Sequence, residues 1–145
     1  MSGHGIASQA AANAYRSASL TVPPLTAVVM LYDCAIATLQ RSTQAMEARR
    51  IEEAHNSLLR ATAILRGLDY HLDFDRGGAC AERLHTTYNS LILAALRAFG
   101  RPDARERYRK IIAGLTELRN AWAAIAGIPT PSGGSVRKST SALAQ

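Results

Sequence analysis

The chain has 145 residues, 48% of them hydrophobic, so it is long enough for one domain with a buried core. Its formal net charge is +6, but Arg16, Arg137 and Lys138 lie near the chain ends, so the charge is a weak reason to expect nucleic-acid binding. Cys34 and Cys80 are too few for a disulfide framework or a zinc site. With no secretory signal and no apolar run of about 20 residues, we expect a cytoplasmic protein without membrane insertion.

Composition divides the chain into three segments. Residues 1–20 are rich in Ala and Ser and are expected to form a flexible N-terminal cap segment. Residues 21–126 carry the regular apolar pattern and are expected to form a helical bundle. Residues 127–145 are mainly Ser, Gly, Pro and Thr with little to bury, so a disordered C-terminal tail is predicted.

Apolar residues in the bundle segment recur at alternating intervals of three and four, as in helices that pack at a shallow angle. The first helix is expected to start at Pro23 and Pro24, because a first turn does not need their missing N–H groups. Its inner positions are Leu25, Val28, Tyr32, Ala35, Leu39, Ser42 and Met46. Those of the second helix are Ile51, Ala54, Leu58, Ala61, Leu65, Leu68 and Leu72.

Gly77 and Gly78 are expected to form the reversal that leads into the third helix. The inner positions of the third helix are Ala81, Leu84, Tyr88, Leu91, Ala95 and Ala98. Those of the fourth are Ala104, Tyr108, Ile111, Leu115, Leu118, Trp122 and Ile125. No stretch alternates with period two, and short turns make neighbouring helices antiparallel. The pattern predicts an all-α, antiparallel up-down four-helix bundle with a short N-terminal cap segment.

Two Glu-x-x-His motifs, Glu52/His55 and Glu82/His85, are the sharpest chemical signal, because such pairs bind metals in di-iron bundles. All four side chains fall outside the inner stripe, and an antiparallel register separates the two motifs by about 20 Å, at about 1.5 Å per residue. Exposed helix faces explain them better than a metal site. No catalytic, cofactor-binding or metal-binding residue is predicted, and the protein is not expected to be an enzyme.

Further apolar residues lie beside the inner stripe. Val29 and Ile36 flank Asp33 on the first helix; the third helix adds a second group, Ile92, Leu93, Leu96 and Phe99. One interpretation is a wide face turned to the core, and the other is a groove for the amphipathic helix of a partner. Asp33 is then either a solvated carboxylate or a polar marker that sets the partner's register. An N-terminal segment carrying Tyr15 would cover the groove when it is empty.

Several short motifs occur in one order along the chain. They are Ala14-Tyr15 ahead of Thr21 and Pro24, Met30-Leu31-Tyr32-Asp33, Ala54-His55, Leu72-Asp73 with Gly77-Gly78, and Leu118-Arg119 with Ala121-Trp122. From about Asn13 to Ala124 the sequence resembles the FliS family, the flagellar secretion chaperones of bacteria. Departures from the family pattern are Pro23, Cys34 and Phe99, which put the local shape of the groove in doubt.

The resemblance implies a cytoplasmic type III export chaperone. Its partner would be the unstructured C-terminal segment of flagellin, which it would keep from polymerising too early. The chaperone–cargo complex would then be presented to the flagellar export gate, and a second partner, an anti-sigma factor, is open. The candidate partner-binding residues are Tyr15, Val29, Asp33, Ile36, Ile92, Leu93, Leu96 and Phe99. The alternative is a general helical adaptor for another disordered segment.

Overall fold

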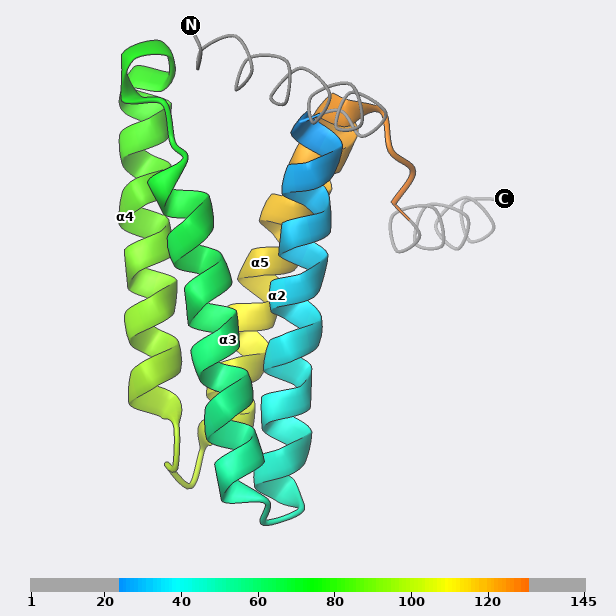
Figure 1. Ribbon diagram of the computed structural model, residues 1–145, viewed down its shortest axis with the longest axis vertical. Coiled ribbons are helices and arrows are strands. Elements are labelled where there is room, and N and C mark those ends of the chain that lie inside the picture. Colours follow the sequence, from blue (N-terminus) through cyan, green and yellow to red (C-terminus); the bar gives the residue numbers. More distant parts are fainter. Residues whose placement is uncertain (1–23, 131–145) are drawn as a thin grey trace, which may run out of the picture. The chain divides into compact units, whose positions relative to one another are not determined.

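A computed structural model describes residues 24–130, which form four helices and no strand. The helices are α2 (Pro24–Glu47), α3 (Ile51–Tyr70), α4 (Phe74–Ala98) and α5 (Ala104–Ala126) (Figure 1). The predicted all-α, four-helix fold is therefore confirmed. The predictions for residues 1–20, which include Tyr15, and for tail residues 131–145 lie outside the described residues.

The described residues belong to two compact units. The larger unit is Met30–Ala121, and the described part of the smaller unit comprises residues 24–29 and 122–130. In the smaller unit, α5 ends before Gly127, whose left-handed φ of 76° directs its own N–H and the following one toward carbonyls of the last helical turn. The N–H of Gly127 donates to the Ala124 carbonyl, and that of Ile128 to the Ala123 carbonyl.

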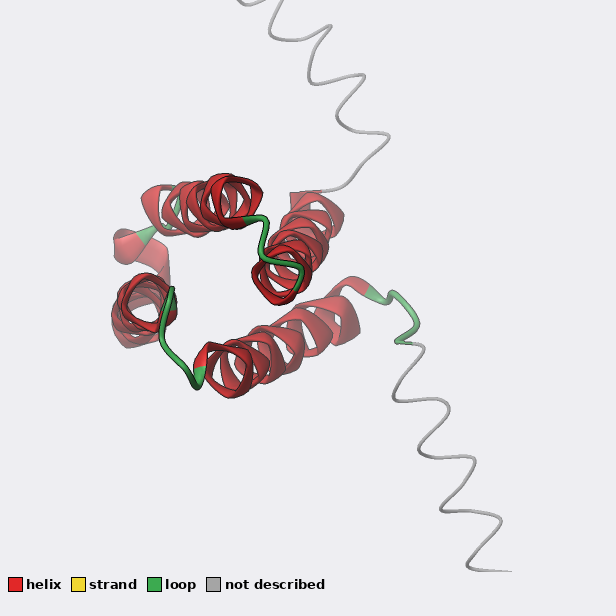
Figure 2. Ribbon diagram, turned by 90° about the horizontal axis from the view of Figure 1, so that it is seen from below, coloured by secondary structure: helices red, strands yellow, loops and turns green. Residues whose placement is uncertain are grey.

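Successive helices run in opposite directions within Met30–Ala121, and an end-on view shows them around a common core (Figures 1 and 2). Most predicted inner positions of this unit are buried, as the helical spacing requires. They include Tyr32, Ala35, Leu39, Ala54, Leu58, Ala61, Leu65, Leu68, Ala81, Tyr88, Ala95, Ala98, Ala104, Tyr108, Ile111 and Leu115. Ile51 is a correction: it is 53% exposed, because it is the first residue of α3 and lies beyond the packed length of the helix.

Hydrogen bonds inside the core join helices that are far apart in sequence. The hydroxyls of Tyr32 on α2 and Tyr88 on α4 lie 2.5 Å apart across the bundle. The Ser42 hydroxyl on α2 donates to the Ala54 carbonyl on α3 at 2.8 Å. A buried hydroxyl without a partner costs free energy, so these bonds make the polar groups compatible with burial and favour one register of the helices.

The connection into α4 consists of a helix cap, one helical turn and a kink. Residues 71–73 follow α3, and Asp73 caps the new helix by accepting from the Arg76 N–H at 3.1 Å. Gly78 then kinks α4, with φ of 50° and ψ of −126°. Its neighbour Gly77 is also required, because a Cβ there would lie 2.7 Å from that of Ala81. The glycine pair therefore lies at the bend through which the chain enters the long part of α4.

The turn between α2 and α3 uses an arginine where glycine is usual. Arg49 has a left-handed φ of 63°, and its N–H donates to the Met46 carbonyl while that of Arg50 donates to the Ala45 carbonyl. This pair of bonds is the Schellman ending of a helix. A left-handed backbone costs a residue with a side chain about 1 kcal/mol.

Alkaline pH should destabilise the fold through Tyr88 and Tyr108. Burial raises the pKa of both hydroxyls above the ordinary 10.0; the bond to Tyr32 adds to the rise at Tyr88, and Ser42 partly offsets it at Tyr108. The two tyrosines therefore lose their protons at lower pH in the unfolded chain than in the folded protein. Their contribution to the free energy of unfolding is fully present below pH 10 and falls above it, by up to about 1.4 kcal/mol per pH unit for each tyrosine.

Urea unfolding at pH 9 and pH 11, followed by circular dichroism, measures this loss. Tyr108→Phe should flatten the fall in the free energy of unfolding. Tyr70→Phe is the control, because that ring is 84% exposed. Equal slopes for the native protein and Tyr108→Phe would contradict the assignment.

Candidate functional site

The seam between α3 and α4 is set by two contacts near its ends. The rings of His55 and Phe99 pack with centroids 5.5 Å apart. Towards the other end, His85 Nδ1 lies 2.6 Å from Asp69 Oδ1. Each step forward along α3 is therefore matched by a step backward along α4, as in an antiparallel pair.

Exposed leucines follow the outer side of this seam. Leu59 lies four residues after His55, and Leu96 lies three before Phe99, so both are on the faces that meet and at about the same level. Leu59 and Leu93 are each 46% exposed and Leu96 is 38% exposed. We call Leu59, Leu93, Leu96 and the half-buried Phe99 the α3/α4 patch. Contiguous apolar side chains on a surface are typical of protein interaction sites.

The opposite seam, between α2 and α5, is held by ion pairs. Arg119 Nε lies 2.8 Å from Asp33 Oδ1, and Arg119 Nη2 lies 3.3 Å from Asp33 Oδ2. The Arg119 side chain is only 15% exposed, so the carboxylate satisfies a guanidinium that water reaches poorly. Further along, Arg105 Nε lies 3.0 Å from Glu47 Oε2. Asp33 is therefore exposed, but its main role in the structure is to bind α5.

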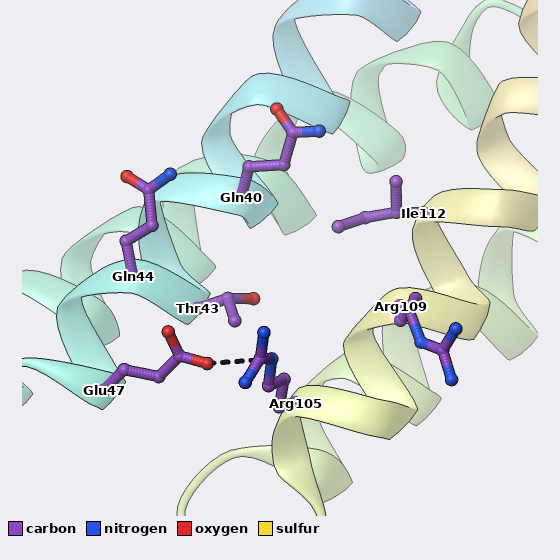
Figure 3. Close-up of a pocket in the computed structure, with 7 residues that line it drawn as sticks. All are labelled: Gln40, Thr43, Gln44, Glu47, Arg105, Arg109 and Ile112. Carbon is purple, nitrogen blue, oxygen red and sulfur yellow. Dashed lines mark ion pairs between the residues drawn. The ribbon is translucent and has the colours of Figure 1, made fainter.

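A hollow lies between these two ion pairs. Its volume is about 530 Å³, and residues of α2 and α5 line it (Figure 3). The lining residues are Gln40, Thr43, Gln44, Glu47, Arg105, Arg109 and Ile112. We call this set the α2/α5 groove. Its walls carry amide, hydroxyl, guanidinium and carboxylate groups beside the apolar Ile112, so it is suited to a ligand with both polar and apolar groups.

The structure separates the candidate partner-binding residues. Leu93, Leu96 and Phe99 lie together on the α3/α4 patch. Asp33 and the half-buried Ile36 lie on the α2 face that meets α5, in the other seam. The two groups therefore lie on two helix pairs, α3/α4 and α2/α5, which are on opposite sides of the larger unit (Figure 2).

Two further candidates are not outer positions as expected, and Tyr15 lies outside the described residues. Ile92 is 6% exposed, because it follows His85 and precedes Phe99 by seven residues and so packs into the α3 interface. Val29 is 2% exposed. Leu59 was missed, since the preceding Leu58 already filled the inner stripe; only the register with α4 identifies it.

The two Glu-x-x-His motifs have separate surroundings. His55 packs on Phe99 and His85 binds Asp69, near opposite ends of the seam. Among residues 24–130, no three His, Cys, Asp or Glu side chains are grouped to hold a metal ion. Cys34 and Cys80 are both free and exposed.

The fold and its two exposed seams define a helical bundle suited to binding other proteins. Within residues 24–130, none of the helices has the length and apolarity of a membrane span. The model of the family described as "Flagellar protein FliS" matches residues 7–129. The chain belongs to the FliS family, as its motifs suggested. FliS proteins are flagellar export chaperones that bind flagellin, and the family is not known for enzymatic activity. No curated protein matches the sequence.

Proposed function

We propose that this protein binds the C-terminal segment of flagellin in the cytoplasm, prevents its premature polymerisation and aids its delivery to the flagellar export apparatus. The observation that carries the proposal is the α3/α4 patch on a chain of the FliS family. The patch presents three exposed leucines on two neighbouring helices.

The energetics of such a partner support an apolar surface. A disordered segment that folds on binding spends about 2–5 kcal/mol on ordering. At about 25 cal/mol per Å² of apolar surface, about 80–200 Å² must be covered to offset that cost before any net affinity appears. Exposed leucines on a helix pair provide such surface at the spacing that an amphipathic helix matches.

The rigidity of the seam supports the same partner. His55 and Phe99 hold the patch at one end, and His85 and Asp69 hold the seam at the other. A guest helix therefore meets leucines whose backbone is already ordered, so the guest alone bears most of the ordering cost. Moderate affinity is expected, which suits a chaperone that must release its cargo.

A peptide of about 40 residues from the C-terminus of a cognate flagellin tests the function. Mixed with the full chain, it should gain helical circular dichroism beyond the sum of the separate spectra, because binding and folding are coupled. A peptide of the same composition in scrambled order is the control. Binding of another disordered segment with equal affinity would favour a general helical adaptor, and no binding of the flagellin peptide would reject the proposal.

A further inference from the structure

Three hollows meet at Arg105, at the end of the larger unit where the α2–α3 and α4–α5 turns lie. Arg105 lines all three, Arg109 lines two, and Glu47 lines two. Figure 3 shows Glu47 and Arg105 paired across the α2/α5 groove, with Ile112 farther along it. The largest hollow is open to a ligand that enters from outside, and it is the only one of the three with Ile112 in its wall.

This end of the molecule has a surplus of positive charge. The stretch 97–110 has six basic residues and two acidic ones. The basic residues are Arg97, Arg101, Arg105, Arg107, Arg109 and Lys110. Both carboxylates are already engaged: Arg107 binds Asp103 at 2.8 Å, and Arg109 binds Glu106. These hydrogen bonds lower the pKa of Asp103 and of Glu106, so both carboxyls stay ionised.

The two terminal segments offer no acidic side chain to this surface. All 11 Asp and Glu residues lie between positions 33 and 117, and the segments 1–32 and 118–145 contain only basic charged side chains. Neither terminal segment can therefore neutralise the surplus with side-chain carboxylates.

The walls also contain apolar side chains, which favours a protein over a nucleic acid as that molecule. Ile112 is half-buried in the α2/α5 groove, and the adjoining hollow contains Met46 and the 53% exposed Ile51. A nucleic-acid backbone would leave these side chains uncovered. Arg49, held in a left-handed conformation that glycine adopts without cost, adds a further cation to this wall.

We propose that the α2/α5 groove binds an acidic amphipathic helix of a partner protein, whose carboxylates pair with Arg105 and Arg109 and whose apolar side chain covers Ile112. The present Glu47–Arg105 and Glu106–Arg109 pairs are no obstacle, because side chains that are about half exposed or more gain little from pairing and exchange partners readily. Helices α2 and α5 lie across the bundle from α3 and α4 (Figure 2), so a ligand in the groove need not displace one on the α3/α4 patch.

Two 18-residue peptides with the same Glu, Leu and Ala content test the proposal with the full chain. One places Leu and Glu on opposite faces of a helix, and the other has a scrambled order. Fluorescence anisotropy should show the amphipathic peptide binding at least tenfold more tightly. In NMR spectra of the protein, the amide chemical-shift changes caused by this peptide should centre on Thr43, Gln44, Arg105 and Ile112. The Kd of the peptide should rise with salt concentration, because the contacts are ionic.

Charge reversal provides the matched variants. R105E/R109E should raise the Kd of the amphipathic peptide at least tenfold, whereas R60E/R66E, with the same change in net charge on exposed positions of α3, should change it less than threefold. R105Q/R109Q, which removes the charge without reversing it, gives a second variant if the first does not fold. Flagellin peptide binding by R105E/R109E and R105Q/R109Q should be unchanged, which separates this proposal from the proposed function.

Several results would overturn the proposal. Equal affinity for the two peptides, or equal loss in R60E/R66E, would mean that net charge alone attracts the acidic peptide. If a 20-nucleotide thymidine strand binds more tightly than the amphipathic peptide, and R105E/R109E loses that binding, the surface would be assigned to nucleic acid. Unchanged peptide binding in both the R105E/R109E and R105Q/R109Q variants would place the site elsewhere.

Discussion

The double variant L93Q/L96Q should bind the flagellin C-terminal peptide about 30-fold more weakly than the native protein. Both side chains are partly exposed, at 46% and 38%, and a guest helix would cover that remaining surface. Fully burying one leucine contributes about 1.5–3 kcal/mol, so covering about two fifths of each, together with the matching guest surface, amounts to about 2 kcal/mol. That free energy corresponds to the 30-fold change in Kd.

Glutamine is the chosen replacement because its helix propensity is close to that of leucine. The helical spectrum and the melting temperature of L93Q/L96Q should therefore stay near those of the native protein. Leu31→Gln is the matched control: it removes a leucine that is 42% exposed from α2, away from the α3/α4 patch. Unchanged affinity in L93Q/L96Q, or equal weakening by Leu31→Gln, would reject the patch as the flagellin site.

Tyr88→Ala should lower the free energy of unfolding by about 3–5 kcal/mol, the usual cost of truncating a large buried ring. Tyr88 is 2% exposed, and its ring centroid lies 6.3 Å from that of Tyr32 on the diagonally opposite helix. The substitution leaves a cavity in the centre of the bundle and removes the hydroxyl contact between α2 and α4. Since the free energy of unfolding of a domain is about 5–15 kcal/mol, the variant should be close to unfolding at 37 °C.

Urea unfolding monitored by circular dichroism measures this loss. Tyr88→Phe keeps the ring and should cost only about 1 kcal/mol, the net contribution of one hydrogen bond. Tyr70→Ala, at a ring that is 84% exposed, should change stability by less than about 0.5 kcal/mol. A loss below 1 kcal/mol for Tyr88→Ala would mean that the diagonal tyrosine pair is not part of the stable core.

Which residues face the core could mostly be predicted from spacing alone. Tyr32, Leu58, Tyr88 and Leu115 were all assigned to the inner stripe, and all are buried. Spacing succeeds here because burial in a helix repeats every three or four residues, a property of the local backbone that neighbours do not alter. It failed at Ile51, where the apolar repeat continued into the first residue of a helix but the packed surface did not. It also failed at Ile125, which is 67% exposed near the end of α5.

The candidate site was harder to predict, because the side of a helix that meets a neighbour depends on the order of helices around the bundle. Ile92 and Leu93 are consecutive apolar residues, yet the first is buried against α3 and the second is 46% exposed. The order of apolar and polar residues in the sequence does not distinguish the two. The contact between His55 on α3 and Phe99 on α4 does, because it shows which side of α4 faces α3.

By itself, the sequence determined the helical class, the inner stripe and the family of this protein, because each follows from residues in a local order. Only the tertiary structure decided that Asp33 binds Arg119 across 86 residues of chain and that Ile36 and Leu93 lie on different sides of the bundle. It also decided that Arg105 and Arg109 line a groove with residues of α2. The physical reason is that such contacts depend on which helices become neighbours, and the free energy of packing all four helices together selects that arrangement.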